Sequence, residues 1–475
     1  MSAGANAQAA DWLLESGDKA SKRYAHAEGE QHYTHALALL GRLKREDEAS
    51  RSLVLHQKRA GVRFATGRFD DAVSDFTAVL DAARATGDAA HESAALIGLC
   101  QALFQMHRLG EMEVRAGEAI RAAERAEPAH RADIMAVMGQ KHNCYGEVAE
   151  AAPLLDDAIE LARSIDYQPA LCTALTWRGA LHYWQSEYDR ADVLISEAHE
   201  LAAALRNGFF LLATLFFGGL IRGNQGRISD AIFALTEGMA IARRNGDRFW
   251  YPRLPNCLGW MHREMQDLDG ALKYDRESLD SGRRYHVLEA QANSLINLAC
   301  DYTQTGAMNH VEPVYLEVEG IFARDAWFRW RYNIRHQAGA AAHWLKIGDL
   351  DQAATCADRL LETATRYGAW KYVVSAHNLK GAIARRRNEL PVAIAQLRAA
   401  SEHLRAHPAP LIAWRTHAAL ARVLKATGDI DGAARAIDES AAILRKIADG
   451  VRDSALREIF ITSGPVRSVL MAAST

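Results

Sequence analysis

Apolar residues recur along this chain at the spacing of an amphipathic helix, and short polar turns interrupt them at regular intervals. The clearest turn spans residues 226–231 and follows an almost wholly apolar segment at residues 209–224. After the turn, one helical face carries Ile232, Leu235, Met239 and Ala242. The pattern predicts a unit of helix, tight turn and helix.

Ten copies of this turn can be aligned on the position of Ala231, and successive copies lie about 40 residues apart, a regularity that indicates a repeat architecture. The aligned anchor residues are Ala72, Met112, Ala151, Ala191, Ala231, Ala271, Val311, Ala353, Ala393 and Ala433. A less regular helix pair at residues 9–44 precedes the ten repeats, so we expect about eleven antiparallel pairs.

A column of small residues supports this alignment. Twelve positions before the anchors stand Ala60, Cys100, Gly139, Gly179, Gly219, Gly259, Ala299, Ala341, Gly381 and Ala421. Glycine inside a helix costs about 1 kcal/mol relative to alanine, so five glycines in one column need a compensating reason. The column predicts a position at which two helices approach closely.

These patterns predict an all-α, right-handed solenoid with a period of about 40 residues, forming one continuous superhelix. We expect residues 1–8 to be disordered and residues 9–44 to form an N-terminal capping pair. Ten repeats then occupy residues 45–447, and residues 448–475 form C-terminal capping helices and a tail.

Composition narrows the class of protein further. The chain has 475 residues, a formal net charge of −3 and 49% hydrophobic residues, which argues against nucleic acid as a partner. No apolar run reaches the length of a membrane span, and the N-terminus lacks a secretion signal. The six cysteines are widely spaced without a C-x-x-C pair, as in reduced core residues of a cytoplasmic protein.

The motifs of common enzyme classes are absent. The sequence has no phosphate-binding G-x-x-x-x-G-K-[ST] loop, no His-Glu-x-x-His and no strand-linked G-x-G-x-x-G. His142, His182 and His262 all stand nine positions before an anchor, and a metal site would need such residues from different repeats to converge. We interpret them as core histidines. The prediction is a protein that is not an enzyme, with no catalytic residues, no cofactor and no metal.

The turn, the small residue twelve before the anchor and the apolar positions four and seven after it resemble the tetratricopeptide repeat, although the period here is longer than usual for that repeat. Long repeats of this kind are similar to the superhelical domains of large bacterial signalling ATPases, including the maltose-regulon activator class. The segments at residues 14–40 and 456–470 resemble the borders of the C-terminal repeat region in adenylate/guanylate cyclase-like proteins. Because this chain has no cyclase or ATPase part, their catalysis does not transfer.

Large aromatic and basic residues gather on the first helices of the late repeats, at residues 250–260, 327–332, 370–372 and 414–415. In tetratricopeptide superhelices the first helices line the concave wall, and the resemblance therefore places these residues there. The candidate partner-binding residues are Arg253, Asn256, Trp260, Arg263, Asn293, Trp330, Arg331, Arg335, Lys371 and Asn378. The same register adds Ser375 and Arg385. Arginine and lysine bind carboxylates or phosphates, asparagine bonds a peptide backbone, and tryptophan supplies apolar area.

These residues are also compatible with a purely structural role, in which they pack against the next repeat and extend their charges to water. Phe209, Phe210, Phe216 and Phe217, with Trp177 and Tyr183, form an apolar middle that fits core or a self-association surface. The leading hypothesis is a scaffold in bacterial signal transduction that binds a protein or peptide, acidic in character, through its concave wall. The alternative is a small-molecule-sensing regulatory domain. A homodimer is compatible with either.

Overall fold

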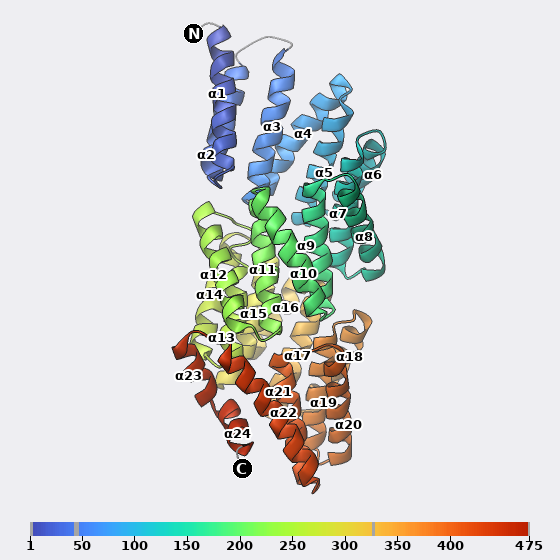
Figure 1. The fold of residues 1–475 in the computed structure, drawn as a ribbon, viewed down its shortest axis with the longest axis vertical. Coiled ribbons are helices and arrows are strands. Elements are labelled where there is room, and N and C mark those ends of the chain that lie inside the picture. Colours follow the sequence, from blue (N-terminus) through green and yellow to red (C-terminus); the bar gives the residue numbers. More distant parts are fainter. Residues whose placement is uncertain (1–2, 42–46, 325–327, 474–475) are drawn as a thin grey trace. The chain divides into compact units, whose positions relative to one another are not determined.

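The structure is a computed structural model, and it describes residues 3–41, 47–324 and 328–473. In these ranges every regular element is helical, with twenty-four α-helices and one 3-10 helix (Figure 1). The first helices of the pairs are α1 (Ala3–Ser21), α3 (Asp47–Ala65), α5 (Ala89–Gln105), α7 (Pro128–Tyr145), α9 (Gln168–Trp184), α11 (Gly208–Asn224), α13 (Leu254–Glu264), α15 (Leu288–Thr305), α17 (Arg329–Ile347), α19 (Trp370–Arg386) and α21 (Pro410–Ala426).

The second helices are α2 (His26–Leu40), α4 (Phe69–Thr86), α6 (Leu109–Ala123), α8 (Val148–Ser164), α10 (Tyr188–Ala204), α12 (Ile228–Asn245), α14 (Leu268–Arg284), α16 (Val311–Arg324), α18 (Leu350–Arg366), α20 (Leu390–Ala406) and α22 (Ile430–Asp449). The 3-10 helix η1 (Met308–His310) precedes α16, and α23 (Ser454–Thr462) and α24 (Gly464–Ala472) follow the last pair. The all-α class and the eleven pairs expected from the sequence are therefore confirmed.

The helix boundaries differ from expectation at the N-terminus. Helix α1 begins at Ala3, whereas the sequence predicted an unstructured stretch up to residue 8. The expected end of the capping pair at residue 44 lies outside the described residues. At the other end, α23 and α24 occupy the segment predicted to carry capping helices.

Each of the ten anchored turns contains one residue with positive φ. Six of these residues are glycines, which adopt the left-handed region without steric cost, and the others are His107, Ser186, Gln266 and Asn388. All ten anchor residues are buried, and nine of them have no exposed surface. The turn therefore ends the first helix and directs the anchor of the second helix into the core.

The column of small residues lies where the two helices of one pair meet. A Cβ added to Gly139, Gly219 or Gly381 would come within 2.5 to 2.9 Å of the leucine four positions after the anchor. The small residue therefore receives a side chain from the second helix of its own pair.

Contacts divide the chain into two compact units. Unit 1 comprises the chain up to Arg178 with Leu194–Thr214 and Gly238–Tyr251; unit 2 comprises Gly179–Val193, Leu215–Glu237 and the chain from Pro252 onward. The sequence predicted one continuous superhelix without this division. Helices α9 to α12 each contribute residues to both units.

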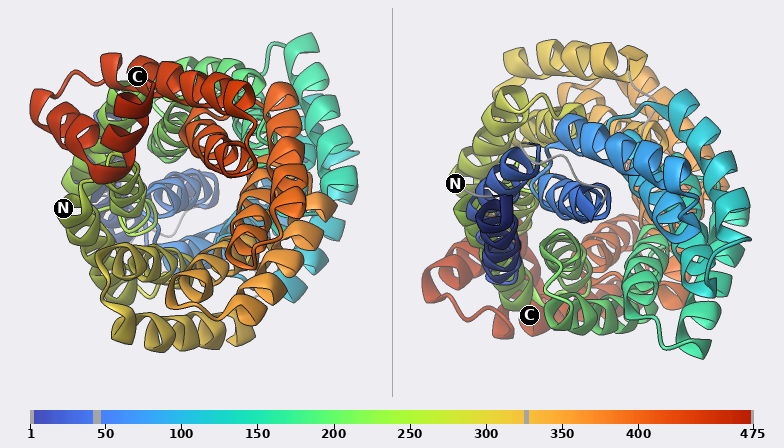
Figure 2. Two further views of the ribbon diagram at one scale, coloured as in Figure 1. Left: turned by 90° about the horizontal axis from the view of Figure 1, so that it is seen from below. Right: turned by 90° about the horizontal axis from the view of Figure 1, so that it is seen from above.

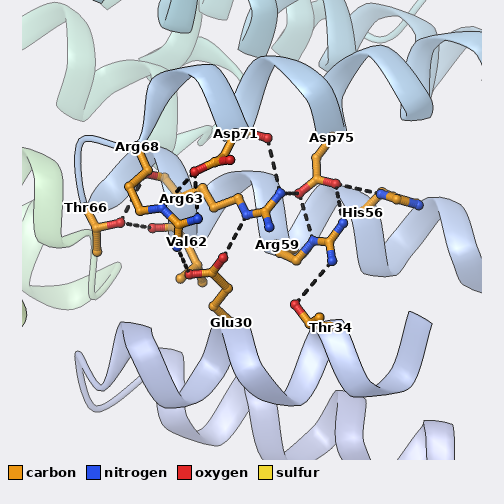
Figure 3. A network of polar contacts seen from close by, with 10 residues as sticks. All are labelled: Glu30, Thr34, His56, Arg59, Val62, Arg63, Thr66, Arg68, Asp71 and Asp75. Carbon is orange, nitrogen blue, oxygen red and sulfur yellow. Dashed lines mark hydrogen bonds and ion pairs between the residues drawn. The ribbon is translucent and has the colours of Figure 1, made fainter. Parts of the chain in front are cut away.

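Unit 1 contains a polar network that joins α2, α3 and α4 (Figure 3). The buried carboxylate of Asp75 accepts hydrogen bonds from Arg59 and Arg63 at 2.7 to 2.9 Å and lies 2.7 Å from His56 Nδ1. Arg63 also binds Glu30 of α2 at 2.9 Å. Burial alone would raise the pKa of Asp75, but hydrogen bonds and positive charge from these partners outweigh it and lower the pKa.

In unit 2, helices α21 and α22 pack side by side and are drawn in red in Figures 1 and 2. Their core includes Leu424 and Ala436. The segment after α22 contacts the start of α12, because Ser229 Oγ accepts a hydrogen bond from the Arg452 amide at 2.8 Å. Arg452 also pairs with Asp230 at 2.8 Å. Segments far apart in the sequence thus meet at one edge of the unit.

Candidate binding site

The structure buries six of the ten predicted binding residues. Arg253, Asn256, Arg263, Asn293, Trp330 and Arg331 are each at most 9% exposed. They belong to the first helices of late pairs or, for Arg253, to the residue just before α13. These residues lie on or next to first helices as expected, but most of them are packed rather than open to solvent.

Arg253 is neutralised by a residue of the next repeat. Its guanidinium contacts the carboxylate of Glu289 at 2.5 to 2.7 Å, and both side chains are buried. A buried arginine is tolerated when a carboxylate pairs with it at this distance. Arg253 therefore joins α13 to α15 and offers little free charge to a partner.

Arg263 is also neutralised by buried carboxyl groups. It lies 2.9 Å from Asp301 and 3.5 Å from Asp275, and it donates a hydrogen bond to Asn297 Oδ1 at 3.0 Å. Burial and the neighbouring Asp301 raise the pKa of Asp275 well above its ordinary value, although Arg263 opposes the shift. One cation thus serves two buried carboxyl groups, as expected of a structural network.

Six of the ten predicted residues line one cavity of about 50 Å³. We call it the basic cavity. The six are Asn256, Trp260, Asn293, Arg331, Arg335 and Lys371, and the remaining wall is formed by Tyr183, Leu220, Cys257 and Tyr372. Helices α9, α11, α13, α15, α17 and α19 contribute to it. Residues that the sequence placed on separate repeats are brought to one point.

The other predicted residues lie outside the basic cavity. Trp330 lines an adjoining cavity of about 20 Å³, and its ring packs 4.7 Å from that of Tyr367. Asn378 donates a hydrogen bond to Thr416 Oγ1 at 2.8 Å. Arg385 is exposed. Trp327, part of the aromatic segment noted in the sequence, lies outside the described residues.

The basic cavity has an excess of positive charge. Lys371 donates a hydrogen bond to Asn224 Oδ1 at 2.9 Å, and its Nζ lies 4.9 Å from the centre of the Trp260 ring. Arg335 donates to Asn297 Oδ1 at 2.6 Å. In the described part of the chain, neither of these cations nor Arg331 forms an ion pair with a carboxylate. The nearby Glu264 is paired with Arg415 at 2.7 Å.

The titration of two wall residues reflects this charge. Burial alone would raise the pKa of the Tyr372 phenol, but Lys371, Arg335 and Arg331 outweigh it and lower the pKa. Burial lowers the pKa of Lys371, and the two arginines shift it in the same direction. Both shifts indicate a positive potential that favours a negative group in the cavity.

A larger groove lies between α20 and α22 and has a volume of about 1310 Å³. Pro410, Ala413 and Leu420 of α21 contribute to its lining, as do Gly226 and Arg227 of the α11–α12 turn. We call it the α20–α22 groove. Sequence reasoning did not identify this groove.

The walls of the α20–α22 groove carry basic residues. Arg398 and Arg405 stand seven positions apart on α20, Lys446 faces them from α22, and all three are exposed. None of the three forms an ion pair within the part of the chain that the structure describes. Of the four acidic residues that line the groove, three are engaged: Glu439 lies 2.9 Å from His417, Asp449 lies 2.9 Å from Arg457 and Asp230 lies 2.8 Å from Arg452. Glu402 forms no ion pair in the described residues. In the sequence, this basic wall could have been recognised from Arg398 and Arg405, which are two helical turns apart and therefore lie on the same face of α20.

The three aligned histidines stabilise turns. Nδ1 of His142, His182 and His262 lies 2.5 to 2.7 Å from the carboxylate five positions later in each case. These pairs fix the start of the second helix and belong to separate repeats. Among the described residues, no group of three histidine, cysteine or acidic side chains is arranged to hold a metal ion.

All six cysteines are free thiols, and four of them are buried. No helix among the described residues has both the length and the apolar character needed to cross a membrane. Phe209, Phe210, Phe216 and Phe217 are buried, so the apolar middle of the chain is core.

Comparison with solved structures identifies the fold of this chain, whereas comparison of sequences finds no match. No family model matches the sequence, and no curated protein matches it significantly. The structure is similar to that of a Rap protein complexed with competence and sporulation factor, with a TM-score of 0.59 and 13% identity over 76% of this chain and 100% of that one. The chain has a tetratricopeptide-like repeat fold.

A second structure agrees with this assignment. The Rap conjugation gene regulator of plasmid pLS20, in complex with the Phr* peptide, gives a TM-score of 0.51 with 11% identity. The similarity covers 75% of this chain and 96% of that chain. The similarity of fold therefore covers about three quarters of the protein.

Proposed function

We propose that this protein is a non-catalytic scaffold that binds an acidic peptide or protein segment in the α20–α22 groove. The main support for this proposal is the size of the groove, because its volume of about 1310 Å³ exceeds the roughly 300 to 1,000 Å³ typical of small-molecule sites. The basic cavity, at about 50 Å³, is too small for a peptide. The peptide site is therefore moved from the concave wall predicted by the sequence to the last two repeats.

The chemistry of the α20–α22 groove favours an acidic ligand. The alanine, leucine and proline residues of its lining offer apolar contact, while Arg398, Arg405 and Lys446 carry unpaired positive charge on its walls. Arginine binds carboxylates through paired hydrogen bonds, which are roughly twice as strong as neutral ones. The Phr* peptide bound by the Rap regulator shows that one protein of similar fold binds a peptide, and this supports the proposal.

The proposed setting is bacterial signal transduction in the cytoplasm. The free thiols of all six cysteines fit a reducing compartment. The resemblance of residues 14–40 and 456–470 to cyclase-like signalling ATPases supports a regulatory role. A homodimer remains compatible with this role.

The experiment selects ligands from a random phage-displayed peptide library against the native protein and measures the affinity of the selected peptides. We expect these peptides to be acidic and the double variant Arg398→Glu, Arg405→Glu to bind them at least ten-fold more weakly, because two attractive charges become repulsive. Arg435→Glu is the matched control, because Arg435 is exposed on α22 but does not line the groove.

Equal affinity of the double variant and the Arg435→Glu control would rule out the α20–α22 groove as the peptide site. Selection of peptides without acidic residues would contradict the proposed ligand chemistry. Circular dichroism of each variant confirms that the helical fold is intact before affinities are compared.

A further inference from the structure

The basic cavity holds more positive charge than its own residues balance. Arg331 is only 9% exposed, yet no carboxylate pairs with it in the described part of the chain. Its guanidinium instead lies 5.7 Å from the ring centres of Tyr183 and Trp184. Burying an arginine without a paired anion is costly, because the guanidinium loses part of its hydration and gains no opposite charge in return.

Two buried carboxamides in the wall of the cavity are also incompletely bonded. Asn256 Nδ2 and Asn293 Oδ1 have no hydrogen-bond partner in the described residues, and both side chains are 3% exposed. A buried polar atom without a partner costs about 1 to 3 kcal/mol, so such atoms in one small space indicate a missing polar group. A carboxamide can turn to present its NH₂ group to an acceptor.

The size of the basic cavity limits what fills it. A volume of about 50 Å³ suits a few heavy atoms, since a water molecule needs roughly 10 to 15 Å³ on the same measure. Three residues of the lining, Trp260, Arg335 and Lys371, are partly exposed. The occupant is therefore a small group, either free or at the end of a larger molecule.

We propose that the basic cavity binds a single carboxylate group, held by Arg331, Arg335 and Lys371 and by the carboxamides of Asn256 and Asn293. Two arginines and one lysine around one small space match the acceptor oxygens of a carboxylate. Two nearby carboxylates of the described residues do not take this place, because Glu264 is paired with Arg415 and Glu289 with Arg253. The site is separate from the α20–α22 groove and does not depend on a peptide binding there.

Such a carboxylate belongs either to a free small acid or to a chain terminus, and suitable probes separate these sources. Acetate represents the small acid, N-acetylglycine represents a peptide-like terminus, and N-acetylglycinamide removes the charge. Inorganic phosphate tests another oxyanion. All are compared at one ionic strength set with sodium chloride, so that general screening stays constant.

The first measurement is the melting temperature of the native protein, of Arg331→Met and of Arg385→Met with each probe. We expect acetate or N-acetylglycine, but not the amide, to raise the melting temperature of the native protein and of Arg385→Met. Arg331→Met should bind the probe roughly ten-fold more weakly or not at all. Arg385 is the matched control, because it is an exposed arginine on α19 outside the cavity.

If Arg331→Met does not fold, the partly exposed Arg335 provides the second variant, Arg335→Gln. An independent readout in the native protein is the phenolate absorbance of Tyr372, obtained as the difference between native protein and Tyr372→Phe. A bound carboxylate should raise the pKa of Tyr372 by neutralising the charges that lower it.

Equal responses of the native protein, Arg331→Met and Arg385→Met would overturn the proposal. So would a response to phosphate without any response to the carboxylates. The absence of any probe effect on both the melting temperature and the Tyr372 titration would also overturn it. Each of these results leaves the α20–α22 groove, and the peptide measurement made there, unaffected.

Discussion

Gly259 of α13 faces the carboxylate of Asp275 on α14 so closely that a Cβ on Gly259 would lie 2.5 Å from it. Contacts this short force the neighbour to move, and Asp275 is held in a buried network with Arg263 and Asn297. The small-residue column therefore has a direct physical cause at this position. It creates space for the buried side chain of Asp275.

Gly259→Ala should consequently destabilise the protein, by about 1 to 3 kcal/mol, even though alanine is the better helix former. Chemical denaturation measures the change. Gly320→Ala on α16 is the control, because a Cβ there meets no atom within 4 Å. That substitution should be stabilising, by up to about 1 kcal/mol. Similar effects of the two changes would show that the contact with Asp275 does not determine the residue at position 259.

Asp75 should make unit 1 sensitive to acid. Its lowered pKa means that its ionised form stabilises the fold above the ordinary aspartate value of about 3.9, and that this stability is lost as the pH falls toward the lower folded value. Asp75→Asn should cost about 3 to 5 kcal/mol near neutral pH, because Arg59 and Arg63 lose a buried partner. Its unfolding free energy should also fall less steeply on acidification.

The exposed Asp81 on the same helix provides the comparison for this measurement. Asp81→Asn should change the unfolding free energy by no more than a few tenths of a kcal/mol. Unfolding by urea across a range of acidic pH values compares the three proteins. An Asp75→Asn variant with the same acid sensitivity as the native protein would show that other carboxyl groups cause the acid unfolding.

Arg253 and Glu289 should behave as a structural pair. Glu289→Gln leaves a buried cation without its partner and should destabilise by about 3 to 5 kcal/mol. In the double variant Arg253→Met, Glu289→Leu, apolar groups replace both charges, and much of this loss should be recovered. A double-mutant cycle of Arg253→Met, Glu289→Leu and the double variant, followed by thermal or chemical unfolding, gives the coupling energy. A coupling energy of zero would contradict the structural pair and would leave Arg253 available to bind a partner.

Asp429 should stabilise the start of α22, because its side chain accepts a hydrogen bond from the Gly432 amide at 2.8 Å. Asp429→Ala removes this N-cap and should cost about 1 kcal/mol, whereas Asp429→Ser should retain most of the stability. Asp438→Ala, an exposed change in the middle of α22, is the comparison. Equal losses at positions 429 and 438 would argue against a specific capping effect.

Much of the repeat could be predicted from local sequence. The apolar spacing indicated the pairing of α3 to α22, and in each anchored turn the residue with positive φ lies five positions before the anchor. The anchors and the small column were also recognisable, because each depends on residues within one helix pair. Because the same contacts form within every helix pair, the residues that make them recur at a fixed interval in the sequence.

Local sequence could not predict which basic residues form ion pairs and which do not. Arg253 and Arg263 find their carboxylates 36 and 38 residues away, and Lys371 contacts Asn224 across 147 residues. Whether an arginine is neutralised or left unpaired depends on how neighbouring helices rotate and where long side chains end. No pattern in a single helix records those positions.

The sequence by itself thus determined the helix pair, its turn and the number of pairs, because local hydrogen bonding and burial act within each repeat. Only the tertiary structure decided that Arg253 and Arg263 are structural, that Arg331, Arg335 and Lys371 surround one cavity, and that a groove lies between α20 and α22. The physical reason is that charge compensation and open volume arise between helices, where distances are set by the packing of several repeats at once.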